Sequence, residues 1–234
     1  MAVIDALHGP VQPPATGKPA TAAVVLLHGY GSDGNDLIGL APYFADAIPH
    51  AVFYAPNGPS ALDGGAFGGR QWFSLRDFNP EILGQDTKLR AKFFAAVAVE
   101  IESAAAILNR YLDQILAHHS LAANRLVLLG FSQGTMMALH VGLRRAQQLG
   151  GIAGYSGELL APERLAMEMK SKPPVVLIHG ADDPVIPAAK SRDAEGTLTA
   201  LGISCQTLII PGLQHGIDDT GAQFGAQFMQ RTIG

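Results

Sequence analysis

The residue best placed for nucleophilic chemistry is Ser132, the middle residue of the sequence GFSQG at positions 130–134. This segment matches G-x-S-x-G, a pattern in which the serine occupies a tight turn between a strand and a helix. A strand-like run (RLVLL) precedes it and a helix-forming run (TMMALHV) follows it. The context predicts that the hydroxyl projects above the end of a sheet and that the helix N-terminus points free N–H groups at the reacting carbon. A chance match in a glycine-rich chain is the alternative, which the flanking runs argue against.

The two glycines of this segment, Gly130 and Gly134, have a predicted structural role. At so tight a corner, the neighbouring backbone and the following helix pass too close for a Cβ atom. We therefore expect both positions to require glycine.

A serine hydroxyl is a poor nucleophile until a base takes its proton, and the base needs a third group to orient it. Around such a turn the order along the chain is serine, acid, histidine. His179 ends a strand, but no acid that also ends a strand lies between it and Ser132. His215 lies in a loop between the last predicted strand and the last helix. The carboxyl edge of a parallel sheet is where ligands bind, so His215 is the predicted general base.

The acid is expected in the loop after the preceding strand, which reads HGADDPVIP from His179. Asp182 and Asp183 compete for this role, because successive loop residues point in different directions. The proline that follows Asp183 restricts its backbone to an extended conformation and favours it. Asp182 stays open as the alternative on this reasoning alone.

Acyl transfer also needs N–H donors for the oxyanion. The backbone amide of Gln133, directly after the nucleophile, is one predicted donor. The second is expected in the loop after the first buried strand, where the sequence HGYG places the amide of Tyr30.

The same loop also fits a dinucleotide-binding fingerprint, because Gly29, Gly31 and Gly34 spell G-x-G-x-x-G after a strand. That fingerprint needs a carboxylate at the end of the next strand to bind the ribose. The next predicted strand ends in YAPN, without a carboxylate. The nucleotide interpretation is therefore the weaker one.

Four segments together, HGYGSDG from residue 28, GFSQG from 130, HGADDPVIP from 179 and GLQH from 212, resemble the phospholipase/carboxylesterase family, which includes the acyl-protein thioesterases. The resemblance extends from about residue 24 to 228. It implies an α/β-hydrolase fold and a catalytic triad of Ser132, Asp183 and His215. It also implies an oxyanion hole made by the backbone amides of Tyr30 and Gln133.

The resemblance extends to a Trp-Phe pair in the long loop, here Trp72 and Phe73. These two residues are predicted to wall the substrate cleft, or to anchor the loop to the core. Many family members carry an aliphatic residue where Tyr30 stands. Because the oxyanion hole uses the backbone, this difference leaves it intact but can reshape the acyl pocket.

Strand-like and helix-like segments alternate along the chain, which predicts a single α/β domain over residues 1–234 with a mostly parallel sheet covered by helices on both faces. Residues 1–19 contain four prolines and are expected to form an arm. Residues 56–86 are rich in Gly and Pro and are expected to form a long loop that binds substrate or acts as a lid. Strands are expected at about 22–28, 50–55, 121–130, 152–155, 174–179 and 203–210, and helices at about 35–47, 87–117, 133–150, 187–200 and 220–232.

The bulk composition narrows the class of protein further. The 234 residues are 48% hydrophobic and 15% charged, with a net charge of −4 and one cysteine. The chain can bury a large core, carries no basic cluster for nucleic acid and cannot form an internal disulfide. No signal peptide or membrane-spanning segment is recognised, so a cytoplasmic protein without stable membrane insertion is expected. No metal or cofactor is expected, and a homodimer is compatible with the sequence.

The predicted function is hydrolysis of carboxylic esters through an acyl-enzyme, as in a carboxylesterase. An acyl-protein thioesterase or lysophospholipase that acts on longer acyl chains is the alternative within the class. A non-catalytic ligand-binding module on the same fold is the less favoured alternative from another class. Activity against esters of graded acyl length separates the first two, and reaction of Ser132 with an organophosphonate excludes the third.

Overall fold

The computed structural model describes residues 3–65, 68–76 and 86–234. The strands are β1 (Val11–Gln12), β2 (Ala22–Leu27), β3 (Ala51–Tyr54), β4 (Ser60–Ala61), β5 (Arg70–Gln71), β6 (Leu126–Phe131), β7 (Gly151–Tyr155), β8 (Val175–Gly180) and β9 (Cys205–Ile210). The helices are α1 (Gly34–Ile38), α2 (Ala41–Ala45), α4 (Thr87–Ala96), α5 (Ala98–His119), α6 (Gln133–Arg144), α7 (Pro162–Glu168), α8 (Ala189–Ala200) and α9 (Asp219–Ile233), with a 3₁₀ turn at Ala123–Arg125.

Over the described residues, seven strands form one sheet in the order β1-β3-β2-β6-β7-β8-β9. Strand β1 pairs antiparallel with β3, and every other neighbouring pair is parallel. Strands β4 and β5 pair separately as a small antiparallel hairpin. The predicted α/β fold with a mostly parallel sheet is therefore confirmed, and the N-terminal arm contributes an antiparallel edge strand.

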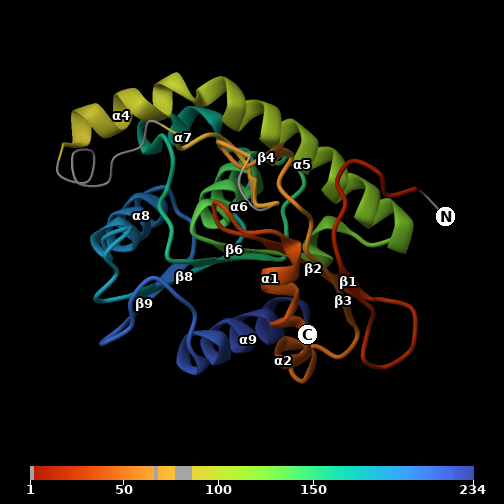
Figure 1. Ribbon diagram of the computed structural model, residues 1–234. Coiled ribbons are helices and arrows are strands. Elements are labelled where there is room, and N and C mark those ends of the chain that lie inside the picture. The colour runs from red at the N-terminus through yellow and green to blue at the C-terminus, as the bar shows by residue number, and fades with distance from the viewer. Residues whose placement is uncertain (1–2, 66–67, 77–85) are drawn as a thin grey trace.

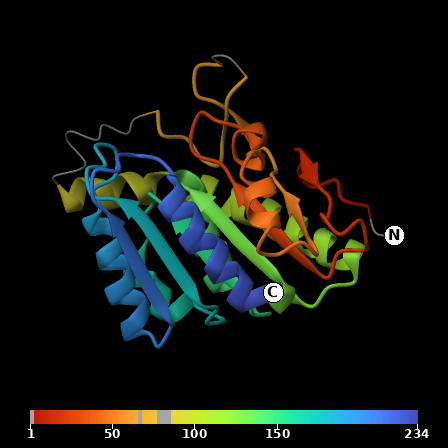
Figure 2. The ribbon, with the colours of Figure 1, turned by 90° about the horizontal axis from the view of Figure 1, so that it is seen from below.

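Helices cover both faces of the sheet (Figures 1 and 2). Helices α4 and α5 arch over one face, and α9 and α2 lie against the other. Strand β2 shows why both faces are apolar: Val25 and Leu27 join the core under α5 and α6, whereas Val24 and Leu26 join the core under α2 and α9. A parallel strand buried on both faces must be apolar at every position, as the β2 sequence is.

The parallel arrangement brings the loops that carry the predicted site to one edge. The loops after β2, β6, β8 and β9 all leave the carboxyl end of a parallel strand. Helix α6 begins directly after β6, and residues along most of its length are buried between α5 and the sheet. The turn at residues 130–134 that carries Ser132, called the elbow below, is therefore attached to a helix that is buried along most of its length.

Three predicted helices differ in extent from the observed ones. The segment after β2 forms two short helices, because Asp33 caps the first through the amide of Asn35 and Pro42 starts a second. The helix predicted for 87–117 bends at Val97 into α4 and α5, although the amide of Val97 still donates to the carbonyl of Phe93. Helix α6 ends at Arg144, earlier than predicted.

The predicted long loop at 56–86 contains the β4–β5 hairpin. Residues 66–67 and 77–85 of that loop lie outside the described residues. Motion of the segment as a lid stays a prediction. Within the part of the chain that the structure describes, no helix is both long and apolar enough to cross a bilayer.

Candidate active site

Ser132 lies at a strained corner between β6 and α6. Its backbone angles are φ 54° and ψ −117°, outside the regions that L-residues ordinarily occupy. A Cβ on Gly130 would lie 2.4 Å from the backbone of Gly134, and one on Gly134 would lie 1.9 Å from the carbonyl oxygen of Leu27. Both glycines of the elbow are therefore required by close backbone approach, as predicted.

Hydrogen bonds to the neighbouring strand hold this corner in place. The Ser132 amide donates to the carbonyl of Tyr155 at 2.8 Å. The Thr135 hydroxyl lies 2.7 Å from the carbonyl oxygen of Gly130 and accepts the amide of Tyr155 at 2.9 Å. Strain of this kind costs about 1–3 kcal/mol and persists only where the surroundings enforce it. These bonds, together with the burial of α6, supply that enforcement.

The predicted acid and base meet across the β8 and β9 loops. The Nδ1 atom of His215 is 2.7 Å from Oδ2 of Asp183. Because the carboxylate can only accept, Nδ1–H donates, which leaves Nε2 of His215 free to take a proton. The other oxygen of Asp183 accepts the amides of Val185 and Ile186 at 2.8 and 2.9 Å. The proline at 184 turns the chain so that these amides face the carboxylate.

The environment of Asp183 favours its ionised form. Burial of this side chain alone would raise the pKa, but hydrogen bonds from His179, His215 and the amides of Ile186 and Val185 outweigh it and hold the pKa well below its usual range. The neighbouring Asp182 is exposed. The structure thus favours Asp183 over Asp182 as the partner of the imidazole.

The sequence analysis set His179 aside as the general base and did not predict its role beside the acid, where it is fully buried. Its Nε2 lies 3.1 Å from Oδ2 of Asp183 and 2.8 Å from the carbonyl oxygen of Ile186, while Nδ1 lies 2.7 Å from the hydroxyl of Ser191. His179 and His215 therefore both contact the same oxygen of the acid. The available signal was a histidine at a strand end, four residues before the aspartate.

His215 also lies next to the elbow. Its ring centroid is 5.0 Å from that of Phe131, the residue directly before Ser132. Residues 131 and 155 are register partners in β6 and β7, and β8 and β9 continue the same parallel edge. The loops that carry the predicted serine, acid and histidine therefore converge at one rim of the sheet.

One predicted oxyanion donor, Gln133, belongs to the elbow itself, and the other, Tyr30, lies in the loop after β2. Gln133 is the first residue of α6, where amides lack an intrahelical acceptor. Tyr30 follows β2, and the amide of the next residue, Gly31, is already used in a bond to the carbonyl of Arg70 at 2.9 Å. Among the described residues, neither the Tyr30 nor the Gln133 amide donates to a protein acceptor.

Trp72 and Phe73 are each 1% exposed and anchor their loop to the site. The side chain of Gln133 accepts the Trp72 amide at 2.9 Å and donates to the Phe73 carbonyl at 2.8 Å. The Trp72 indole N–H donates to the carbonyl of His28 at 3.0 Å. These contacts support the predicted anchoring role, and contact with substrate stays a prediction.

His28, which the sequence did not single out for chemistry, is also buried at this site. Its Nε2 accepts the amide of Gly58 at 2.8 Å, so Nδ1–H donates to the carbonyl of Gly29 at 2.7 Å. Burial lowers the pKa of His28 and keeps it neutral. The ring therefore joins the loop after β2 to the loop after β3.

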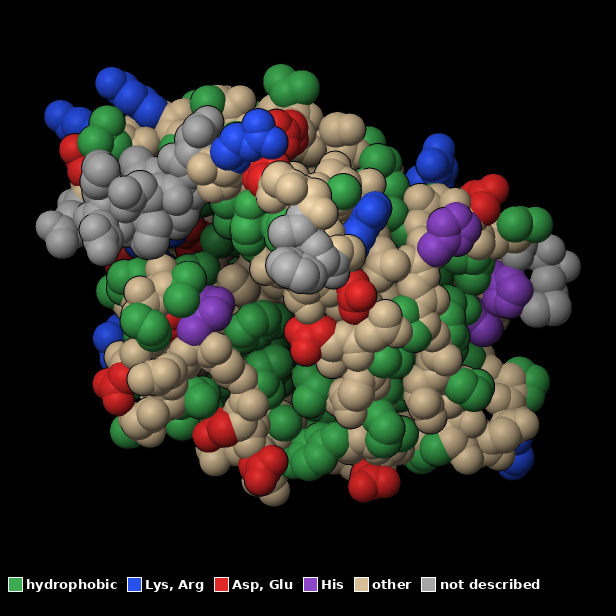
Figure 3. All heavy atoms as spheres, in the orientation of Figure 1, with side chains coloured by type: hydrophobic (Ala, Val, Ile, Leu, Met, Phe, Trp, Pro, Cys, Tyr) green, Lys and Arg blue, Asp and Glu red, His purple; other side chains and the backbone are tan. Residues whose placement is uncertain are grey.

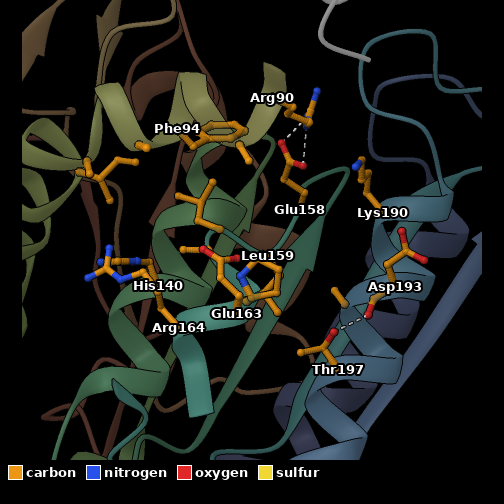
Figure 4. Close-up of a pocket in the computed structure, with 18 of the residues that line it drawn as sticks. Arg90, Phe94, His140, Glu158, Leu159, Glu163, Arg164, Lys190, Asp193 and Thr197 are labelled. Atoms are coloured by element: carbon orange, nitrogen blue, oxygen red, sulfur yellow. Dashed lines mark hydrogen bonds and ion pairs between the residues drawn. The ribbon is translucent and has the colours of Figure 1, made fainter. Parts of the chain in front are cut away.

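A separate cavity of about 250 Å³ lies between α4, α6, α7 and α8 (Figure 4). Phe94, Leu159 and other apolar side chains line much of it. At one end, Arg90 of α4 and Glu158 of the β7–α7 loop form an ion pair in which both side chains are almost fully buried. Ser132 and His215 are not among its lining residues. Acidic and basic side chains are both scattered over the face of the molecule that Figure 3 shows.

The parallel sheet and the elbow at its carboxyl edge define the α/β-hydrolase class. The sequence profile described as phospholipase/carboxylesterase matches residues 11–233. Because this match covers nearly the whole chain, the protein belongs to the phospholipase/carboxylesterase family.

Several relatives agree with this assignment. The chain is 28% identical over 226 residues to esterase YpfH of Escherichia coli, covering 97% of this chain and 88% of the relative. It is also 28% identical over 215 residues to acyl-protein thioesterase 1 of Gibberella zeae, covering 83% of each. A rice relative, 27% identical over 88% of this chain and 82% of its own length, is called a probable inactive carboxylesterase. The crystal structure of esterase PE8 superposes with a TM-score of 0.85 at 39% identity, covering 97% of this chain and 99% of the other.

Proposed function

We propose that this carboxylic ester hydrolase works through an acyl-enzyme formed on Ser132. The Nε2 atom of His215 takes the hydroxyl proton while Oγ attacks the acyl carbon, and the carbonyl electron pair moves to oxygen. When the tetrahedral intermediate collapses, the carbon–oxygen bond to the alcohol breaks and His215 returns the proton to it. Water then repeats the sequence, releasing the carboxylic acid and free Ser132.

The observation that carries this proposal is the 2.7 Å bond between His215 and Asp183 beside the elbow. An ionised Asp183 holds the imidazole with Nε2 unprotonated and stabilises the imidazolium that forms after proton transfer. A histidine oriented in this way next to a strained serine fits a nucleophile–base pair better than a binding pocket alone.

The amides of Tyr30 and Gln133 are the proposed oxyanion donors. Both are free among the described residues and border the elbow, where negative charge develops on the carbonyl oxygen. A single donor of this type contributes about 10²–10³-fold to kcat. Trp72 and Phe73 complete the proposal as supports of the substrate cleft.

The test is a Ser132→Ala variant with Ser103→Ala as its matched control. Ser103 is an exposed residue of α5, so its replacement removes a hydroxyl without touching the site. We expect Ser132→Ala to lower kcat by about 10⁶-fold, whereas Ser103→Ala keeps full activity. Ester hydrolysis by Ser132→Ala at an appreciable fraction of the normal rate would remove the serine from the mechanism.

A thioesterase or lysophospholipase activity on longer acyl chains is the second candidate, favoured by the relatives called acyl-protein thioesterase. The two activities are separated by a series of about eight esters and thioesters whose acyl chains range from about 2 to 16 carbons. A maximum of kcat/KM at short chains supports the carboxylesterase, and a maximum at long chains supports the alternative. The cytoplasmic location stays part of the proposal and is tested by cell fractionation.

The relative called probable inactive shows that a non-catalytic member is a real alternative within this family. An organophosphonate that carries a fluorescent tag separates the two, because an inert scaffold does not react with it. Labelling that disappears in Ser132→Ala supports the enzyme. If the protein is not labelled and hydrolyses none of the esters, it is a binding module and not an enzyme.

A further inference from the structure

The loop that carries Tyr30 forms backbone pairs with the β4–β5 hairpin. The Gly31 amide donates to the carbonyl of Arg70 at 2.9 Å, and the Arg70 amide donates to the carbonyl of Ser32 at 2.8 Å. The Arg70 guanidinium in turn donates to the carbonyls of Gly58 and Pro59, both at 2.9 Å. The hairpin is therefore the frame against which this loop is held.

The Asp63 carboxylate organises the hairpin by accepting hydrogen bonds from four donors. Its Oδ2 accepts the Ser74 hydroxyl at 2.7 Å, the Tyr30 hydroxyl at 3.0 Å and the Leu75 amide at 3.1 Å. Its Oδ1 accepts the side-chain amide of Gln71 at 3.1 Å. The side chain of Asp63 is only 14% exposed. One carboxylate thus connects Tyr30, in the loop after β2, with Gln71, which precedes Trp72, and with Ser74, which follows Phe73.

The protonation states of Asp63 and Tyr30 favour the hydrogen bond between them. Burial alone would raise the pKa of Asp63, but hydrogen bonds from Ser74, Gln71 and Tyr30 hold the pKa below its usual value. Burial and the hydrogen bond to Asp63 raise the pKa of Tyr30 to about 12. The tyrosine therefore keeps its proton and the aspartate keeps its charge, so the bond between them persists at neutral and mildly alkaline pH.

The other proposed oxyanion residue is attached to the same segment. The side chain of Gln133 binds the amide of Trp72 and the carbonyl of Phe73, directly before Ser74. Both residues whose backbone amides would stabilise the oxyanion therefore use their side chains to bind this segment, Tyr30 at Asp63 and Gln133 at Trp72 and Phe73. Asp63 is the side chain within this segment that joins Tyr30 to the residues flanking Trp72 and Phe73, in addition to the backbone bonds of Arg70.

We propose that Asp63 is a positioning residue of the oxyanion hole, which sets the distance between the Tyr30 and Gln133 amides through its bonds to Tyr30, Ser74 and Gln71. The proposal rests on the proposed acyl-enzyme mechanism. Asp63 acts on the reaction only through the backbone that it holds, since it has no part in proton transfer.

Two substitutions test this role. In Asp63→Asn, an amide NH₂ must face either the three donors around Oδ2 or the donor from Gln71, so the cluster cannot be satisfied in either orientation. Tyr30→Phe removes a single bond of the cluster and leaves the backbone amide in place. We expect kcat to fall about 10- to 100-fold in Asp63→Asn and less in Tyr30→Phe, with KM within about threefold, because a displaced donor is lost mainly in the transition state.

A boronic acid inhibitor supplies a readout that a merely structural role would not move. It adds to the serine and presents an oxygen to the hole, so its Kd should rise in proportion to the loss of kcat. The double variant Tyr30→Phe/Asp63→Asn should have a kcat no lower than that of Asp63→Asn, because both substitutions disrupt the same hydrogen bond between residues 30 and 63. If Asp63→Asn fails to fold, Tyr30→Phe carries the test alone.

Asp113→Asn is the matched control, because it disrupts an ion pair between α5 and the nearly buried Arg145 that involves no residue of the Asp63 cluster. If both Asn variants lose stability but only Asp63→Asn loses kcat and inhibitor affinity, the proposal holds. Equal losses in the two variants, or a change confined to KM, would overturn it. If the positioning role of Asp63 fails this test while Ser132→Ala is inactive, the acyl-enzyme mechanism still stands. If Ser132→Ala is active, the mechanism itself is refuted.

Discussion

His179 and Asp183 lie four residues apart, and Nε2 of the histidine is 3.1 Å from Oδ2 of the aspartate. The same oxygen accepts Nδ1–H of His215 at 2.7 Å. One carboxylate oxygen therefore contacts two imidazoles, one fully buried and one at the rim of the sheet. The buried imidazole is itself fixed by Ser191 and Ile186, so the acid has little freedom to rotate.

This arrangement predicts that replacing Asp183 lowers kcat strongly, whereas replacing the adjacent Asp182 changes it little. In Asp183→Asn the amides of Val185 and Ile186 retain the carbonyl oxygen, so NH₂ replaces Oδ2 and faces Nδ1 of His215. The histidine must then carry its proton on Nε2, which blocks it as a base, and kcat should fall about 10⁴-fold. The exposed Asp182→Asn should stay within about threefold of the parent.

Steady-state kinetics on one ester measures both variants, with circular dichroism to show that each is folded. A loss of activity in Asp182→Asn equal to that in Asp183→Asn would contradict the assignment of the acid.

The low pKa of Asp183 also predicts how stability depends on pH. The pKa is lower in the folded protein than the ordinary value of 3.8, so the unfolded chain binds the proton more readily. The stabilisation from this group is therefore present above about pH 4 and is lost as the pH falls further through the folded value. Urea unfolding followed by Trp72 fluorescence at pH 7, 4 and 3 measures it. The free energy of unfolding of Asp183→Asn should approach that of the parent towards pH 3, and a constant difference would argue against this linkage.

The main strands and the order of the site were predictable from sequence because both have local signals. Strands β2, β6 and the first four residues of β8 are apolar runs, and the elbow carries its own pattern of glycines and serine. The topological rule that loops after parallel strands share an edge then brings distant segments together. The bend at Val97 has no such signal, since neither proline nor glycine is nearby.

Long-range contacts, at the site and elsewhere in the fold, were not predictable in the same way. The bond between Arg90 and Glu158 joins positions 68 residues apart, and that between Tyr30 and Asp63 joins positions 33 apart. Neither pair has a fixed spacing or motif, because each depends on how loops pack in three dimensions. A sequence can therefore name the reacting groups while the residues that orient them become visible only in the fold.

The close packing at the elbow predicts that a Gly→Ala substitution there lowers stability far more than one at an exposed glycine. In Gly134→Ala, the Cβ would lie 1.9 Å from the carbonyl oxygen of Leu27 and force β2 and α6 apart. We expect the free energy of unfolding to fall by about 3 kcal/mol or more. Gly196→Ala is the control, because a Cβ in this exposed turn of α8 meets nothing within 4 Å, and alanine should stabilise the helix by about 0.5–1 kcal/mol. Similar urea midpoints for the two variants would show that the elbow tolerates expansion.

The last prediction concerns the buried ion pair at the end of the cavity, where the side chains of Arg90 and Glu158 are 5% and 7% exposed. Arg90→Met leaves a carboxylate buried without its cation and should lower the free energy of unfolding by about 3–5 kcal/mol. Replacing both residues in Arg90→Met/Glu158→Leu should recover most of that loss, because no charge remains buried. Arg164→Met, which breaks a more exposed pair with Glu168, should cost at most about 1 kcal/mol. A double variant as unstable as Arg90→Met would mean that packing around Arg90, rather than the unpaired charge, determines the loss.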